Sequence, residues 1–170
     1  MTNTKKTTPV KKSNNGILIA ACIAIVLISV FFIVKGNTDP EVSADETSQG
    51  GDITIVMSEV TETAKFIPYK AGNTKMEIIA LKAPDGSIRT AFNTCQVCYD
   101  SGRGYYVQEG DVLVCQNCGN RFKASQVEII KGGCNPVPID KDNKTDNGTT
   151  ITISGDFLGQ NKGLFGNWKK

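Results

Sequence analysis

Two Cys-x-x-Cys pairs constrain this chain of 170 residues more than any other feature of it. The first pair is Cys95 and Cys98, the second is Cys115 and Cys118, and residues 99 to 114 separate them. Each pair presents two thiolates from one tight turn, and the segment between them is long enough for the two turns to face each other. The spacing therefore predicts a metal site whose ligands are these four cysteines.

Two further cysteines stand apart from the pairs. Cys134 lies in a loop rich in glycine and proline, residues 132–138. Three roles are open to it: replacing one of the four metal ligands, pairing with another cysteine, or supporting the site. We expect it to contribute to cofactor binding by supporting the site without binding the metal itself. Cys22 lies in an apolar run, where we expect it to face lipid or a packing neighbour. The chain contains no histidine, which excludes imidazole as a metal ligand and as an acid or base. No catalytic acid–base pair stands out, so we expect an electron carrier or accessory protein rather than an enzyme.

Residues 17–34 contain no charge and are rich in Ile, Val, Ala and Phe, which predicts one transmembrane helix. A cleaved signal peptide is the main alternative, but its apolar core is usually shorter and ends in small residues. Lipoprotein processing at Cys22 is disfavoured because this cysteine lies near the start of the run. We expect a basic tail at 1–16 and a solvated linker at 35–51.

The charge distribution predicts how the chain lies in the membrane. The first 35 residues carry five lysines and no acidic residue, so the remaining 14 basic and 17 acidic residues give 14 − 17 = −3 for the rest of the chain. An excess of basic residues before a membrane helix stays in the cytoplasm, which places the amino terminus inside and everything from about residue 36 outside. The acidic balance of the exterior part argues against a nucleic-acid partner.

Alternating and β-branched segments predict a mainly β domain over residues 52–156. The expected strands are 53–57, 65–70, 75–81, 88–92, 105–107, 112–114 and 149–154. Pro68 suggests an edge in the second of these, and residues 124–130 fit either a helical turn or a strand. We expect the tail from Phe157, residues 157–170, to be loosely ordered.

The cysteine pattern alone leaves three kinds of site open. Structural zinc takes four cysteines at this spacing, and an iron–sulfur cluster takes four thiolates as well. Disulfides are the third option, because the domain is predicted to lie outside the cytosol. General secretion moves unfolded chains, and Lys11 and Lys12 form no twin-arginine signal. An exterior cluster would therefore need an unusual assembly route, whereas zinc or a dithiol would not.

Two resemblances favour the cluster. The segment from Cys115 to Phe122 resembles the second cluster-binding loop of Rieske proteins, with Cys118 where the second ligand would be histidine, and residues 133–138 resemble their proline-containing loop. The stretch from about Phe66 to Ile139 resembles the FtrD-like membrane iron–sulfur family more closely. That resemblance is carried by residues 85–92, Cys95 to Tyr99, Gly104–Tyr105, Cys115 to Gly119, Arg121–Phe122 and Gly132 to Pro138.

The family resemblance implies a membrane-anchored, extracytoplasmic iron–sulfur protein that transfers electrons or handles metal beside an iron-uptake permease or a redox complex. This chain has one predicted span, whereas longer members have several, so a direct transport role is not implied. The fold we expect is a small Rieske-like or zinc-ribbon-like domain with four cysteine ligands. The alternatives are a zinc-stapled binding module without redox activity and a thiol–disulfide protein.

Overall fold

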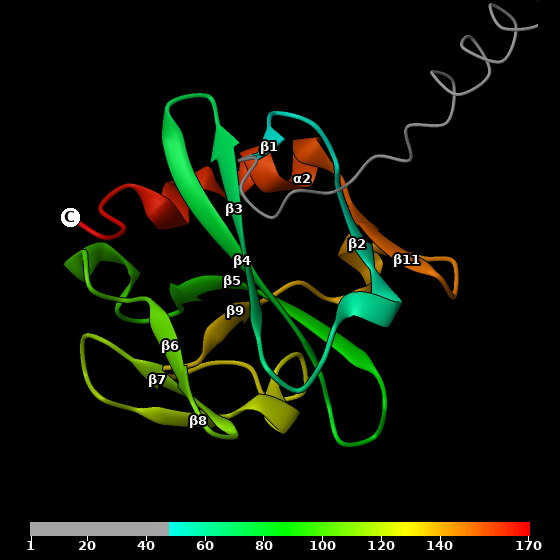
Figure 1. The fold of residues 1–170 in the computed structure, drawn as a ribbon. Helices are drawn as coiled ribbons and strands as arrows, with labels where there is room; N and C mark the ends of the chain where they lie inside the picture. Colours follow the sequence, from blue (N-terminus) through cyan, green and yellow to red (C-terminus); the bar gives the residue numbers. More distant parts are fainter. Residues whose placement is uncertain (1–47) are drawn as a thin grey trace, which may run out of the picture. The chain divides into compact units, whose positions relative to one another are not determined.

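The computed structural model describes residues 48–170, and this part of the chain is mainly β, as the sequence predicts (Figure 1). Its strands form a central five-stranded sheet in the order β1-β3-β4-β5-β9 and two three-stranded sheets, β10-β11-β2 and β6-β7-β8. The strands are β1 (Ser48–Gln49), β2 (Ile53–Val56), β3 (Lys65–Ala71), β4 (Thr74–Lys82), β5 (Ile88–Cys95), β6 (Tyr106–Glu109), β7 (Val112–Cys115), β8 (Arg121–Lys123), β9 (Pro136–Pro138), β10 (Thr145–Asp146) and β11 (Thr150–Ile153).

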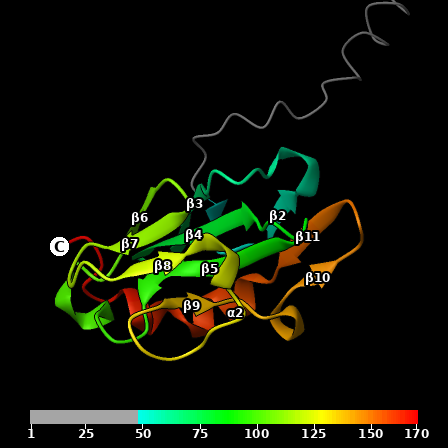
Figure 2. The ribbon, with the colours of Figure 1, turned by 90° about the horizontal axis from the view of Figure 1, so that it is seen from below.

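Strands β3, β4 and β5 pair antiparallel and form the middle of the central sheet. Strand β9 continues the sheet on the far side of β5, with a register shift between Phe92 and Cys95 (Figure 2). Pro68 faces Glu77 of β4, and β1 pairs with β3 only at Tyr69 and Lys70. At Pro68, β3 therefore has a partner strand on one side only. Proline has no amide hydrogen, so at this edge position no hydrogen bond of the sheet is lost.

The central sheet is buried on both faces because β4 alternates between two apolar cores. Met76, Ile78 and Ala80 belong to one core, whereas Ile79 and Leu81 belong to the other. The first core is completed by residues of β2, β11 and the carboxyl-terminal segment, and the second by residues of β6, β7 and β8. Figure 1 shows these two groups of elements on different sides of β4 and β5. Alternate side chains of β4 thus point to opposite faces of the central sheet, and the sheet forms the middle of three layers.

The expectation of a loosely ordered tail after Phe157 is wrong. Residues Gly155–Gln160 form an α-helix, α2, whose first turn is capped by the Ser154 hydroxyl, and a 3-10 helix, η5 (Lys162–Phe165), follows. Leu158 and Phe165 are buried in the first core. The indole of Trp168 donates a hydrogen bond of 2.7 Å to the carbonyl oxygen of Asn93 in β5. The segment is therefore part of the domain, held by long-range contacts that its glycine-rich sequence does not reveal.

One smaller difference concerns the linker. Strand β1 lies inside the expected linker of residues 35–51 and pairs parallel with β3. For residues 124–130, the structure selects the helical turn of the two expected alternatives: the segment from Ala124 is a 3-10 helix, η3 (Ala124–Gln126), followed by turns. Short 3-10 helices also occur at η1 (Met57–Glu59), η2 (Tyr99–Ser101) and η4 (Lys141–Asn143).

The transmembrane helix expected at 17–34 lies outside the described residues. Between residues 48 and 170 no helix has the length and apolar character needed to cross a bilayer.

Candidate metal centre

The first cysteine turn begins where β5 ends. Cys95 is the last residue of that strand and is fully buried, and its amide donates to the Gly104 carbonyl oxygen at 2.7 Å. The Cys98 amide donates to the Cys95 sulfur at 3.2 Å, so the turn folds its backbone back onto the thiol. A Cβ atom at Gly104 would lie 2.2 Å from the Cys98 carbonyl oxygen. Glycine is therefore required there for the next segment to pass behind the turn.

The second cysteine turn begins where β7 ends at Cys115. The Cys115 amide donates to the Asn120 carbonyl oxygen, and the Gly119 amide donates to the Cys115 carbonyl oxygen, both at 2.9 Å. Gly119 has a φ of 72°, a left-handed conformation that glycine adopts without strain. The Cys118 and Asn117 amides act to lower the pKa of the Cys115 thiol, against the larger effect of burial. Backbone dipoles thus face a sulfur in both turns, which stabilises a thiolate.

A third loop carries Cys134 against both turns. The Cys134 carbonyl oxygen accepts a hydrogen bond from the Tyr106 hydroxyl at 3.0 Å and one from the Asn120 amide group at 2.7 Å. Gln96 lies between the first two cysteines. Its side-chain oxygen accepts a hydrogen bond from the Gly132 amide at 3.0 Å, and its side-chain amide group donates to the Pro136 carbonyl oxygen at 3.1 Å. These contacts fix the loop without any contribution from a metal. Gln96 and Asn120 were not singled out from the sequence, because their role depends on a loop that is distant along the chain.

The structure brings the sulfur atoms of all five cysteines of the domain into one cluster. The sulfurs of Cys95, Cys98, Cys115 and Cys134 all lie within 4.8 Å of one another. Cys134 is central: its sulfur lies 3.2 Å from that of Cys95, 3.7 Å from that of Cys98 and 2.7 Å from that of Cys118. Three of the four expected ligands are therefore grouped with Cys134, while Cys118 lies beside Cys134 at the exposed edge. Which four bind the metal stays a prediction.

Burial and hydrogen bonding act on these thiols in opposite directions. Burial raises the pKa of the Cys115 thiol to about 11, and burial together with the neighbouring thiols raises that of Cys134 well above its ordinary value. Burial also opposes ionisation of Cys95, but hydrogen bonds from Tyr106 and from backbone amides outweigh it, so its pKa is lowered. Hydrogen bonds from Cys134 and the Asn120 amide lower the pKa of Cys118 to about 7. The environment thus favours thiolates at two positions before any cation is added.

The comparison with known families decides which class of protein this is. A model described as "Membrane iron-sulfur containing protein FtrD-like" matches residues 60–165. The chain belongs to the FtrD-like family. The match includes all five clustered cysteines and most of the carboxyl-terminal segment, which agrees with the packing of that segment into the domain.

Two further comparisons add little. A solved structure similar to this FtrD-like chain is the quaternary ammonium Rieske monooxygenase CntA in complex with an inhibitor, with 17% identity and a TM-score of 0.40. The similarity covers 63% of this chain and 32% of that one, so this chain spans about a third of the length of the oxygenase it matches. No curated protein sequence matches.

The thiols of the FtrD-like domain fit a metal ion or an iron–sulfur cluster. Four thiolates are the ligand set of tetrahedral zinc and of cysteine-ligated clusters alike. Four sulfurs at about 2.3 Å from one ion would be about 3.8 Å apart, and the four grouped sulfurs lie within 4.8 Å of one another. The donor set therefore suits both cofactors that the sequence left open, and the spacing of the grouped sulfurs is that of a single tetrahedral ion.

The aromatic and basic residues near the site have distinct surroundings. Tyr106 is 1% exposed and belongs to the second core. The Tyr105 ring lies 6.4 Å from that of Trp168, edge to face. Tyr99 is partly exposed beside the first turn. Arg121 is solvated and pairs with Glu109 at 2.7 Å in a surface ion pair.

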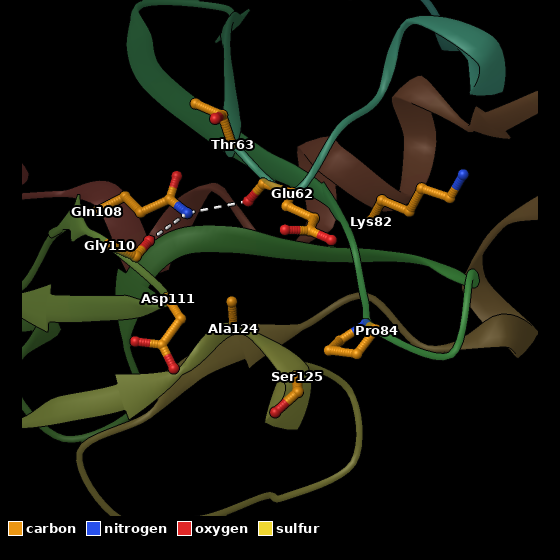
Figure 3. A pocket seen from close by; sticks show the side chains of 9 residues that line it. All are labelled: Glu62, Thr63, Lys82, Pro84, Gln108, Gly110, Asp111, Ala124 and Ser125. Atoms are coloured by element: carbon orange, nitrogen blue, oxygen red, sulfur yellow. Dashed lines mark hydrogen bonds between the residues drawn. The ribbon is translucent and has the colours of Figure 1, made fainter.

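A polar pocket of about 240 Å³ lies between the β2–β3 connection, the β6–β7 turn and η3 (Figure 3). None of its nine lining residues is a cysteine. The Gln108 side chain dominates one wall, where its amide group donates to the carbonyl oxygens of Glu62 and Gly110 and its oxygen accepts from the Ala64 amide. Gln108 therefore holds two loops together, and its polar atoms are already paired. We assign no substrate to this pocket.

Proposed function

We propose that this FtrD-like chain is a membrane-anchored iron–sulfur protein that transfers electrons or handles metal outside the cytoplasm, in association with iron uptake. The observation that carries the proposal is the cluster of five cysteine sulfurs, built from the ends of β5 and β7 and from the loop before β9. Membership of a membrane iron–sulfur family supports both the cofactor and the membrane location. The predicted helix at 17–34 would supply a single-pass anchor.

The exposure of the site supports a role in electron transfer. Cys95 and Cys115 are buried, whereas Cys118 is exposed and Val97, in the first turn, is 64% exposed. A redox partner could therefore approach the edge of the site without any rearrangement of the core. Its apolar border would suit docking of another protein, such as a permease subunit or a redox complex.

We propose that Cys95, Cys98 and Cys115 bind the metal in every loaded form. The fourth thiolate would come from Cys118, as the paired motif predicts, or from Cys134, which the structure groups with the other three. Serine variants separate these cases. If Cys118 is the fourth ligand, Cys118→Ser loses the cofactor and Cys134→Ser retains it. The reverse result assigns Cys134.

Zinc is the second candidate, because the four grouped sulfurs are as close together as a single tetrahedral ion requires. The domain would then be a binding module that zinc holds together, and its function would lie on its surface. A thiol–disulfide protein is a further alternative, favoured by the short approach of Cys118 to Cys134.

Metal and sulfide analysis of the full chain tests the proposal. The protein is purified in detergent from its native host without oxygen, and its absorption spectrum is recorded before and after reduction. Iron with inorganic sulfide and visible bands that bleach on reduction would support the iron–sulfur protein. A colourless protein with stoichiometric zinc would support the binding module, and a protein with neither would leave the thiol–disulfide alternative.

A further inference from the structure

We propose that Cys118 and Cys134 form a reversible disulfide that empties the metal centre, so that the same cysteines bind metal when reduced and release it when oxidised. The inference rests on the proposed metal-binding function and adds a redox control to it. It starts from a surplus: five thiols converge on a site that needs four.

Distance and exposure single out this pair from the other combinations. The two sulfurs lie 2.7 Å apart, closer than the sulfur of Cys134 lies to that of Cys95 at 3.2 Å or of Cys98 at 3.7 Å. A disulfide bond is about 2.05 Å long, so only a small approach is needed. Cys118 is the exposed member of the cluster, whereas Cys95 is fully buried. A dissolved oxidant can therefore reach Cys118 first.

The surrounding backbone keeps the pair aligned when no metal is bound. Asn120, two residues beyond Cys118, donates to the Cys134 carbonyl oxygen at 2.7 Å, which ties the two loops directly. Gly132 and Gly133 have φ values of 83° and 70°, and a Cβ atom at either would meet no other atom within 4 Å. No neighbouring atom therefore crowds the loop at these two glycines, next to Cys134.

The step is a thiol–disulfide exchange with a low-molecular-weight disulfide as the oxidant. The Cys118 thiolate attacks one sulfur of that disulfide, which forms a mixed disulfide and releases one thiolate. Cys134 then attacks the Cys118 sulfur, which forms the Cys118–Cys134 bond and releases the second thiolate. The two cysteines lose two electrons, and the oxidant gains them. Both protons leave to solvent.

Metal release follows from the ligand count. Whether Cys118 or Cys134 supplies the fourth thiolate, their disulfide removes it and leaves Cys95, Cys98 and Cys115. A tetrahedral thiolate site with three ligands binds its ion far more weakly. Reduction restores both thiols and the complete set.

Peptide mapping provides a direct test on the full chain carrying Cys22→Ser, which removes the unrelated thiol. The reduced, metal-loaded protein is treated with oxidised glutathione, remaining thiols are alkylated, and the protein is digested with trypsin. Cleavage after Arg89, Arg103, Arg121, Lys131 and Lys141 places the cysteines on three peptides: 90–103, 104–121 and 132–141. We expect a linked pair of peptides 104–121 and 132–141 and stoichiometric release of metal, both reversed by dithiothreitol and fresh metal.

The controls separate this pair from its neighbours. Fragmentation of the linked peptides in a mass spectrometer shows which cysteine of peptide 104–121 forms the bond. The bond is assigned to Cys118 if the linked pair is lost in Cys118→Ser and kept in Cys115→Ser. A link between 90–103 and 132–141, a bond confined to peptide 104–121, or metal release without any disulfide would each overturn the inference. If the reduced chain binds no metal at all, the proposed function fails, but mapping the disulfide in the metal-free chain still decides whether this pair forms.

Discussion

The hydroxyl of Tyr106 is one of two donors to the carbonyl oxygen of Cys134, and it helps to lower the pKa of the Cys95 thiol. Tyr106→Phe keeps the ring in the core and removes only the effects of the hydroxyl. We expect about 1 kcal/mol lower stability and roughly tenfold weaker metal binding, the lower end of the effect of losing a group that orients a ligand. Urea unfolding and metal competition with a chelator measure the two quantities.

Tyr69→Phe is the matched control for this substitution. Tyr69 is also 1% exposed, and its hydroxyl donates to the Gly51 carbonyl oxygen at 3.1 Å, but it belongs to the first core. It should lose a similar amount of stability with no change in metal affinity. Equal metal affinities for the two variants would show that the Tyr106 hydroxyl does not orient the site.

At the scale of residues, the sequence predicts a cysteine metal site but does not predict which cysteine lies at its centre. The paired spacing brings Cys95, Cys98 and Cys115 together because each pair lies at the end of its own strand. Cys134 was expected to support the site from outside, yet its sulfur lies among the others. Its place depends on hydrogen bonds from Gln96, Asn120 and Tyr106, and no local pattern in residues 132–138 encodes those contacts.

At the scale of elements, one buried ion pair joins three segments. The Glu128 carboxylate accepts bonds from the Thr90 amide and hydroxyl in β5 and from Lys144, which follows η4. The two charged side chains are only 12% and 7% exposed. Lys144→Met leaves the carboxylate buried without its cation, and we expect a loss of about 3 kcal/mol. Urea unfolding of the full chain, followed by the fluorescence of its single tryptophan, measures it.

The control for Lys144 is a pair of similar distance on the surface. Arg121 and Glu109 are separated by 2.7 Å, and their side chains are 56% and 55% exposed. Arg121→Met should cost less than about 1 kcal/mol, because solvent screens exposed pairs. A small and equal effect of both substitutions would mean that solvent reaches the Glu128–Lys144 pair.

The turn between β4 and β5 gives the domain a dependence on acid. Hydrogen bonds from the Ser87 hydroxyl and amide, together with Arg89, lower the pKa of Asp85 from 3.8 to about 2. A carboxyl group whose pKa is lower in the folded state contributes stability above its unfolded pKa and loses it as pH falls through the folded value. Asp85→Asn should therefore be less stable than the parent chain near pH 6, and the difference should shrink between about pH 4 and about pH 2.

Urea midpoints of both chains across this range check the prediction for Asp85. Acid releases metal from both proteins alike, so the difference between them isolates the turn. A difference that stays constant with pH would mean that the Asp85 carboxylate interacts equally with its surroundings in the folded and unfolded chains.

Prediction from sequence was least successful for the carboxyl-terminal segment. Ser154 followed by Asp156 is a helix-start signal, and the Ser154 hydroxyl does cap α2 by accepting from the Phe157 amide. The segment is only six residues of helix, however, and its order comes from burial of Leu158 and Phe165 and from the Trp168 bond to β5. Strands could be predicted from the local alternation of apolar and polar residues, whereas the order of this segment depends on its contacts with the first core and with β5.

At the scale of the whole molecule, the two cores on opposite faces of the central sheet should respond differently to loss of metal. The second core includes Cys95, Cys115 and the small β6-β7-β8 sheet, so the metal would join that sheet to β5 and to the Cys134 loop. The first core is large, aromatic and free of cysteines among its buried members. We therefore expect the first core to persist without metal, whereas the second core would depend on the cross-link that a bound metal would provide.

Hydrogen exchange on the full chain in detergent, with and without its metal, tests this division. We expect removal of the metal to increase amide exchange in β6, β7, β8 and residues 131–135, and to leave β2, β11 and α2 nearly unchanged. The central strand β4 should stay protected, because its ladder to β3 does not involve the site. A uniform rise across all these elements would instead mean that the domain unfolds as one cooperative unit, in which case the metal stabilises both cores through β5.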